Sequence, residues 1–447
     1  MGGKINLFLL TIFFVLFSLS TLALAVDCPI PDTGQTKCFD DTQEITCPQP
    51  GEPFYGQDAH CGNNLHSYTK LDAYGNDLPD TAPSWVVVRD NVTGLIWEVK
   101  TDDSSIHDKD TTYNWDDAVS YCEDLSLGGF ADWRIPTVIE LSCLIARERY
   151  DPSINSTYFP NTVSGDYWSS TASASVLGYV WYVDFYDGSM SLIGKSYGGR
   201  SHVRAVRGGQ CGPFDNFIDH GDGTVSNTDT GLMWQKNTAP GTFNWQQALS
   251  YCESLTLAEY DDWRLPNVNE LQSLVDYSRY NPSINTGFFP DTVSSTDIPS
   301  PNYWSSTTNV YDNEYVWEVS FSTGGLDNNG YKSGYDYVRA VRGGVTESST
   351  TTTISGSTTT TIQGSTTSTP VQPCMSESLY GEQSEKTELL RHFRDNVLST
   401  TPEGQEIIKL YYQWSPAIIE AMEQDEEFKK EVKDMVDGVL TLNGGVE

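Results

Sequence analysis

The chain has 447 residues, of which 61 are acidic and 26 basic, giving a formal net charge of −35 at pH 7. Such a negative field repels nucleic-acid phosphates and anionic lipid, and it weakens the case for a sulfated polysaccharide as ligand. The length exceeds that of one ordinary domain, so we expect several domains.

The N-terminus has the pattern of a secretory signal peptide over residues 1–25. Residues 7–22 are almost wholly apolar, and Ala23-Leu24-Ala25 offers a small-x-small cleavage site. Asp27 precedes Cys28 and disfavours a lipid anchor on that cysteine. We therefore expect a protein that is secreted, at the cell surface or in the periplasm, without an integral membrane segment in the mature chain. The alternative is an uncleaved apolar run that anchors the chain in a bilayer.

The sequence contains two copies of one long unit. Asn114-Trp115 and Asp132-Trp133-Arg134 recur as Asn244-Trp245 and Asp262-Trp263-Arg264, at a constant offset of 130 residues. Other matched segments are Thr93–Trp97 with Thr230–Trp234, Tyr167–Thr171 with Tyr303–Thr307, and Val203–Gly209 with Val338–Gly344. Solenoid repeats span only about 20–50 residues, so this is a domain duplication, and each copy is expected to fold on its own.

The boundaries follow from these matches and from changes in composition. We assign a Cys-containing N-terminal segment to residues 26–60, copy one to 61–209, copy two to 210–344, a Ser/Thr-rich linker to 345–373 and a helical C-terminal module to 374–447. The linker cannot form a core, and we expect a disordered stalk. The module begins at Cys374 and resembles a Cys-containing C-terminal module of other exported bacterial proteins.

Within each copy, periodicity predicts two helices followed by strands. Asn114 is a good N-cap for a helix with Trp115, Ala118 and Cys122 on one face, and Thr137 with Glu140 forms a capping box that opens a second helix. Period-two aromatic stretches over 179–185 and 315–321 predict strands, and each Val-Arg-Ala-Val-Arg motif predicts another. Helices followed by a twisted antiparallel sheet make an α+β domain.

These motifs, in this order, resemble the Lcl C-terminal domain family of bacterial surface proteins. They are Thr-Gly-Leu-x-Trp, Asn-Trp-x-x-Ala, Asp-Trp-Arg-x-Pro, Glu-Leu, Tyr-Trp-Ser-Ser-Thr and Val-Arg-x-Val-Arg-Gly-Gly, and they span about residues 61 to 344. The resemblance implies a C-type-lectin-like fold in both copies, related in architecture to the formylglycine-generating enzymes. It also implies adhesion or ligand binding.

No residue emerges as catalytic. Asp132 with Arg134, and Asp262 with Arg264, could flank an exposed tryptophan, but a structural reading is favoured, in which the tryptophan is buried and the charges satisfy one another or nearby backbone. Tyr-Trp-Ser-Ser-Thr carries hydroxyls without a recurring histidine, which argues against a serine nucleophile. Glu140 and Glu270 are already explained by helix capping, which leaves an acid–base role as the alternative.

No cofactor is predicted, and no ligand-binding residue can be named. The chain has no Cys-x-x-Cys motif and no cluster of histidines with cysteines, so a zinc site is not expected. Asp219-His-Gly-Asp222-Gly223 offers oxygen ligands for calcium, but it lacks the alternating acidic positions of a calcium loop, and a turn before a strand explains it equally well.

Nine cysteines in an exported chain predict disulfides. Cys38 and Cys47 are close enough to close a small loop. The repeat suggests one matched bridge in each copy, Cys61 to Cys122 and Cys211 to Cys252. Cys143 has a serine as its counterpart, so Cys122 to Cys143 is a rival pairing.

We therefore expect a secreted or surface-exposed, non-enzymatic binding or adhesion protein, with two lectin-like heads on a stalk and a carbohydrate or protein ligand. Two alternatives remain. One is an enzyme or degenerate enzyme on a formylglycine-generating-type scaffold, and the other is a structural envelope protein. The oligomeric state and the role of the C-terminal module do not follow from the sequence.

Overall fold

The structure, a computed structural model, describes residues 29–343 except 63, 196–198 and 296–300, together with residues 429, 430 and 433. The predicted signal peptide, Cys28, the Ser/Thr-rich linker and nearly all of the C-terminal module lie outside the described residues. In the described part, no helix is both long and apolar enough to cross a membrane.

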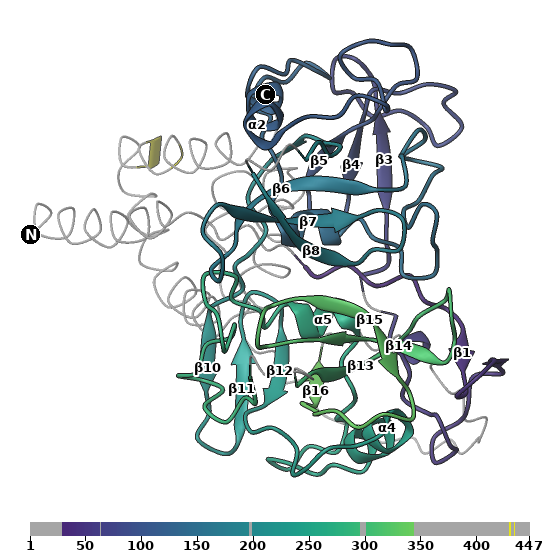
Figure 1. Cartoon of the computed structure of the whole chain (residues 1–447), viewed down its shortest axis with the longest axis vertical. Helices are drawn as coiled ribbons and strands as arrows, with labels where there is room; N and C mark the ends of the chain where they lie inside the picture. The colour runs from purple at the N-terminus through teal and green to yellow at the C-terminus, as the bar shows by residue number, and fades with distance from the viewer. Residues whose placement is uncertain are drawn as a thin grey trace, which may run out of the picture. The chain divides into compact units, whose positions relative to one another are not determined.

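Each copy contains two separate antiparallel sheets, as Figure 1 shows. The four-stranded sheet of copy one has the order β3-β4-β5-β9, formed by Tyr68–Leu71, Val87–Asp90, Ile96–Glu98 and Val206–Arg207. Its three-stranded sheet has the order β6-β7-β8, formed by Asp166–Ala172, Tyr179–Asp184 and Met190–Gly194. The strand predicted at Val-Arg-Ala-Val-Arg is thus only two residues long in copy one.

Copy two repeats this topology. Its four-stranded sheet has the order β10-β11-β12-β16, formed by Phe217–Asp219, Thr224–Asn227, Leu232–Gln235 and Val341–Gly343. Its three-stranded sheet has the order β13-β14-β15, formed by Tyr303–Thr308, Tyr315–Val319 and Leu326–Tyr331. In both copies the last strand returns to the first sheet, so the ends of each copy meet at its four-stranded sheet. Two sheet-rich domains with few helices confirm the α+β class.

The predicted helices form at the predicted caps. Asn114 and Asn244 cap α2 (Trp115–Glu123) and α4 (Trp245–Glu253), each accepting a backbone N–H at 2.9 Å. The capping boxes predicted for the second helices are present at the starts of α3 (Val138–Ser142) and α5 (Val268–Gln272). Each second helix is only five residues long, and every residue in it is buried.

The two copies share one hydrophobic core. α2 and α4 each cover a smaller apolar cluster of their own, but the largest cluster runs without a break through both copies. It includes α3 and α5, and the described residues between 29 and 343 belong to one compact unit. The expectation of two independent heads is therefore replaced by one body with a common core.

The copies meet about an approximate two-fold axis. Gln272 and Ser142, which occupy the same position in the two copies, touch each other with Oε1 and Oγ 3.0 Å apart. Reciprocal contacts lie on either side: the Arg147 guanidinium is 4.1 Å from the ring centroid of Trp317, while Tyr277 meets Trp181 edge-on at 5.4 Å. Each residue of one pair is the repeat counterpart of a residue of the other. Such reciprocal contacts are the mark of a two-fold interface.

The N-terminal segment packs against copy two rather than leading straight into copy one. The predicted Cys38–Cys47 disulfide is confirmed, and it closes the hairpin of β1 (Cys38–Phe39) and β2 (Glu44–Ile45). The hairpin is followed by the 3-10 helix η1 (Asp58–His60), which contacts β13 of copy two.

The other predicted disulfide pairs are wrong. Cys61, Cys122, Cys143 and Cys252 are free, so neither the matched pairs nor the rival Cys122–Cys143 bond forms. Cys211 is disulfide-bonded.

The reason is that the leading cysteine of each copy packs on the other copy. The Cys211 N–H, at the start of copy two, donates to Glu140 of copy one at 3.0 Å. Cys61, at the start of copy one, lies instead in the electrostatic field of Arg264 and Glu270 of copy two, and burial raises the pKa of its thiol to about 11. Neither cysteine is therefore placed beside the helix of its own copy.

Candidate functional site

The aspartates of the two Asp-Trp-Arg motifs are tied to the closing motif of the same copy. Asp132 accepts two hydrogen bonds from the Arg207 guanidinium, at 2.7 and 3.1 Å, and Asp262 accepts two from Arg342, at 2.6 and 3.0 Å. Each arginine holds the pKa of its aspartate below the ordinary value. The pairs are exposed, so they contribute little stability. They do hold the closing motif of each copy next to the Asp-Trp-Arg motif of the same copy.

The arginines of the same motifs are held by the capping glutamates. Arg134 donates to both oxygens of Glu140 at 2.7 and 2.6 Å, and Arg264 does the same to Glu270. Glu140 also accepts the N–H groups of Thr137 and Cys211, which completes four hydrogen bonds to one carboxylate. The sequence predicted that Asp and Arg of one triplet would pair together or with nearby backbone, whereas each has a charged partner outside the triplet.

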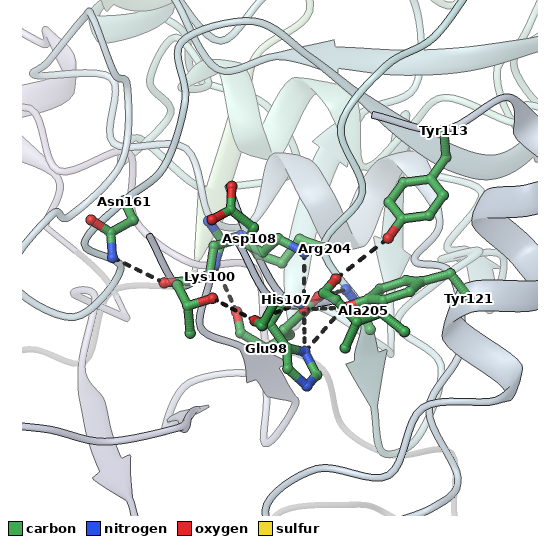
Figure 2. A network of polar contacts seen from close by, with 12 residues as sticks. Glu98, Lys100, His107, Asp108, Tyr113, Tyr121, Asn161, Arg204 and Ala205 are labelled. Atoms are coloured by element: carbon green, nitrogen blue, oxygen red, sulfur yellow. Dashed lines mark hydrogen bonds and ion pairs between the residues drawn. The ribbon is translucent and has the colours of Figure 1, made fainter. Parts of the chain in front are cut away.

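A buried polar network centres on Glu98, the last residue of β5 in copy one (Figure 2). The Glu98 side chain has no exposed surface, and its Oε1 lies 2.9 Å from Lys100 Nζ and 3.2 Å from His107 Nδ1. The Tyr121 hydroxyl donates to the same oxygen, and the Ala205 N–H donates to the other at 3.0 Å. Strand, loop, helix and closing segment therefore converge on one carboxylate.

Glu98 is ionised throughout the ordinary pH range. Burial alone would raise its pKa, but Lys100, the His107 and Tyr121 side chains and the Ala205 N–H outweigh burial and hold the pKa at about 2. A carboxylate with such a low pKa is a poor proton acceptor at neutral pH. The arrangement therefore suits a fixed charge that positions its neighbours, rather than a general base.

Copy two has a neutral version of this network. Gln235 stands in the place of Glu98, donates to the Tyr251 hydroxyl at 2.8 Å and accepts the Ala340 N–H at 3.3 Å. The counterpart of Lys100 is Asn237. The buried ion pair is thus a property of copy one alone.

The network anchors a loop that copy two lacks. The offset between copies is 137 residues at Trp97 and Trp234 but 130 at Trp115 and Trp245, so copy one carries seven additional residues here. They belong to the loop 101–112.

Inside this loop, the Asp108 carboxylate accepts the N–H groups of Asp103, Ser104 and Asp110 at 2.9, 2.6 and 2.9 Å. His107 ties the loop to Glu98, while Ile106 next to it is 62% exposed. The result is an internally bonded loop that presents an apolar side chain to solvent.

A groove of about 580 Å³ lies between the two copies and the segment that joins them. Ligand pockets have volumes of about 300–1,000 Å³, so the groove is of ligand size. Its apolar lining includes Ile139, Phe214 and Leu274, and its polar lining includes Thr171 and Arg279. No charged side chain of the Asp-Trp-Arg motifs reaches it, since all of those are paired elsewhere.

The residues weighed as cation ligands have other partners. In the turn between β10 and β11, Asp219 pairs with Lys236 at 2.5 Å and Asp222 accepts from Thr224 at 2.6 Å. Cys38, Cys47 and His60 bring candidate ligand atoms within 4.8 Å of one another, but the two sulfurs are bonded together. These sulfurs therefore cannot act as thiolate ligands.

Sequence reasoning named no ligand-binding residue, and two signals were available. The fall in offset from 137 to 130 marks the loop of copy one, and the exchange of Glu98 for Gln235 marks its buried charge. The groove left no such signal, because it is formed by segments that are far apart in the sequence.

Comparison with known families decides the relationship. The family model of the Lcl C-terminal domain matches residues 86–207 and 223–342, which together are more than half of the chain. The chain belongs to the Lcl C-terminal domain family. No curated protein matches the sequence.

The two Lcl C-terminal domains do not include every wall of the groove. Gln210, Cys211, Phe214 and Phe217 line it, and all of them lie between the two matched stretches. The N-terminal segment over residues 29–60 also precedes the first match. The groove therefore combines surfaces of the two Lcl C-terminal domains with a connecting segment that lies outside both matched stretches.

Proposed function

We propose that the chain is a non-enzymatic binding or adhesion protein that acts outside the cell or at its surface. Its two Lcl C-terminal domains would be C-type-lectin-like modules that recognise a carbohydrate or a protein. The groove of about 580 Å³ between the copies carries this proposal, because it is of ligand size and mixes apolar walls with a few polar groups.

Two further observations support it. The motif carboxylates that an acid–base mechanism would use are engaged with arginines, and Glu140 has its four hydrogen-bonding positions filled. The Cys38–Cys47 disulfide and the apolar leader at residues 1–25 both favour an oxidising compartment outside the cytoplasm.

The test is to apply the purified full-length protein to a glycan array and to an array of surface and matrix proteins. Ala172→Trp would fill the groove with a large side chain, and Ala174→Trp places the same side chain on an exposed position outside the groove lining. We expect a ligand whose affinity falls at least tenfold in Ala172→Trp and is unchanged in Ala174→Trp. Failure to bind either class, or turnover of a bound molecule, would overturn the proposal.

A further inference from the structure

The approximate two-fold axis gives the groove a counterpart, and the chain's own N-terminal segment fills that counterpart. Residues 31–35 run between copy two and the segment of copy one that follows α3. The Thr33 carbonyl accepts the Arg147 N–H at 2.7 Å. The Gln35 side-chain amide pairs with the backbone of Thr308, accepting its N–H at 2.9 Å and donating to its carbonyl at 2.8 Å.

Further contacts surround these. The Asp58 carboxylate accepts the hydroxyls of Thr307 and Thr33 at 2.6 and 2.7 Å, and Asn269 donates to the Pro31 carbonyl at 3.0 Å. The filled groove thus holds a polypeptide segment that turns at Gly34 (φ 82°), through backbone groups and the Asp58, Asn269 and Gln35 side chains.

The open groove is lined by the counterparts of these same residues. Thr171 and Ala172 correspond to Thr307 and Thr308, and Tyr277 corresponds to Arg147. Ile139 corresponds to Asn269 and also lines the groove. The positions that hold the N-terminal segment on one side of the axis are therefore the walls of the groove on the other side.

The backbone groups of the open groove point the same way as those of the filled one. Ala172 pairs with Val180 in β6 and β7, as Thr308 pairs with Val316 in β13 and β14. In both copies the residue that follows Ala172 or Thr308 donates the hydrogen bond to the neighbouring strand. In copy one this bond runs from the Ser173 N–H to the Tyr179 carbonyl at 2.9 Å. In this register the N–H and C=O of Ala172 face the open edge of the sheet.

The remaining polar groups match as well. The Tyr277 N–H, counterpart of the Arg147 N–H, has no partner among the described residues. The Thr171 hydroxyl oxygen accepts the Val138 N–H at 3.0 Å, as Thr307 accepts from Val268, which leaves its proton to donate as Thr307 donates to Asp58.

From this correspondence we infer that the groove binds a short polypeptide segment of a partner protein and places a glutamine side chain of that segment on the backbone of Ala172. The inference rests on the proposed binding function and names its ligand class. A sheet edge with an unpaired N–H and C=O is the usual acceptor for an added peptide segment. Ile139 in place of Asn269 makes the wall more apolar, so an apolar residue is favoured next to it.

The probe is a labelled synthetic peptide with the chain's own residues 29–37, Pro-Ile-Pro-Asp-Thr-Gly-Gln-Thr-Lys, titrated into the full-length protein and followed by fluorescence anisotropy. We expect saturable binding to one site. A peptide with alanine at the position of Gln35 is expected to bind at least tenfold more weakly, because it loses both contacts to Ala172.

Two variants locate the site. Ala172→Pro removes the outward N–H from an edge strand, where proline is tolerated, and Ala172→Trp fills the groove. Each is expected to weaken peptide affinity at least tenfold, while Ala174→Trp leaves it unchanged. Circular dichroism and the midpoint of thermal unfolding establish that each variant is folded.

The outcomes separate this inference from the proposed function. One outcome is that the arrays yield a ligand whose affinity falls in Ala172→Trp, while the peptide fails to bind at about 1 mM. In that case the proposed function stands and a polypeptide ligand is excluded. Equal peptide affinity of Ala172→Trp and the wild type would also overturn the inference. If neither the arrays nor the peptide give binding, both proposals fall.

Discussion

Buried carboxylates in this chain fall into two groups that differ in what surrounds them. Glu98 and Glu140 have no exposed surface and face a cation, Lys100 or Arg134. Glu318 of copy two is also buried, but its charged neighbours are other acids, chiefly Asp336. The two groups respond in opposite ways to substitution and to pH.

Glu98→Gln should destabilise the protein strongly. It leaves Lys100, which is 2% exposed, buried beside a neutral group. Removal of one partner of a buried ion pair costs about 3–5 kcal/mol, and we expect a loss of about 3 kcal/mol in the free energy of unfolding, measured with urea. The double variant Glu98→Gln/Lys100→Asn reproduces copy two and should regain at least half of the loss. Equal stability of the single and double variants would contradict this account.

Glu318→Gln should stabilise the protein at alkaline pH. Burial and the charge of Asp336 raise the pKa of Glu318 to about 8, above the ordinary value of 4.5. Between these values the folded protein holds a proton that the unfolded chain releases, so the free energy of unfolding falls as pH rises through this window.

The variant should match the wild type near pH 5 and exceed it by about 1–3 kcal/mol at pH 8.5, in urea unfolding at both pH values. The raised pKa of Asp58, about 7, acts in the same direction and remains in both proteins. A variant that lost stability at pH 8.5 would show that Glu318 is held as a carboxylate.

At the scale of elements, local signals carried the prediction. The helices were predictable because an asparagine cap or a capping box begins each one, and those hydrogen bonds join residues three apart. The strands of 179–184 and 315–319 were predictable from aromatic alternation. The short strand Val206–Arg207 was overestimated, because its end is set by pairing with the distant β5.

The loop 101–112 should loosen when its central carboxylate is removed. Asp108→Ala deletes the acceptor for three N–H groups of the loop. We expect faster amide hydrogen exchange over 101–112, by about tenfold or more, with no change in copy two. Asp110→Ala is the matched control, because its carboxylate is exposed and bonds only to Lys109. Unchanged exchange in Asp108→Ala would mean that the other hydrogen bonds of the loop hold it without this carboxylate.

At the scale of the whole molecule, the sequence did not reveal how the copies meet. Contacts on the axis include positions where the copies differ, since Ser142 has Gln272 as its counterpart and Arg147 has Tyr277. Repeat matching favours positions that are the same in both copies, so it assigned each leading cysteine to its own copy. The groove could not be predicted for the same reason, because it exists only once the copies are packed.

The shared core predicts that the copies unfold together. Trp317 of copy two is 2% exposed and packs beneath Arg147 of copy one. Trp317→Ala should remove about 3–5 kcal/mol from the free energy of unfolding. Hydrogen exchange resolved by peptide should then show reduced protection in both copies. A loss confined to copy two would mean that the copies are energetically independent.

The connectivity of the cysteines can be checked directly. Peptide mapping of the non-reduced protein should show Cys38 joined to Cys47 and no bond from Cys211 to Cys61, Cys122, Cys143 or Cys252. Cys122, Cys143 and Cys252 are buried thiols and should react with an alkylating reagent only after unfolding. A Cys211–Cys252 peptide would contradict the exchange of leading segments between copies.

That exchange has a consequence for how such a chain arose. Because each leading segment covers the other copy, neither copy would be complete if it were cut out alone. A relative with one copy would have to associate as a symmetric dimer with swapped arms to make the same contacts. Gene fusion of two such subunits would produce the present chain. Fusion also allows the two halves to diverge, so that a segment present at only one of them, residues 31–35, can add contacts that the other half lacks.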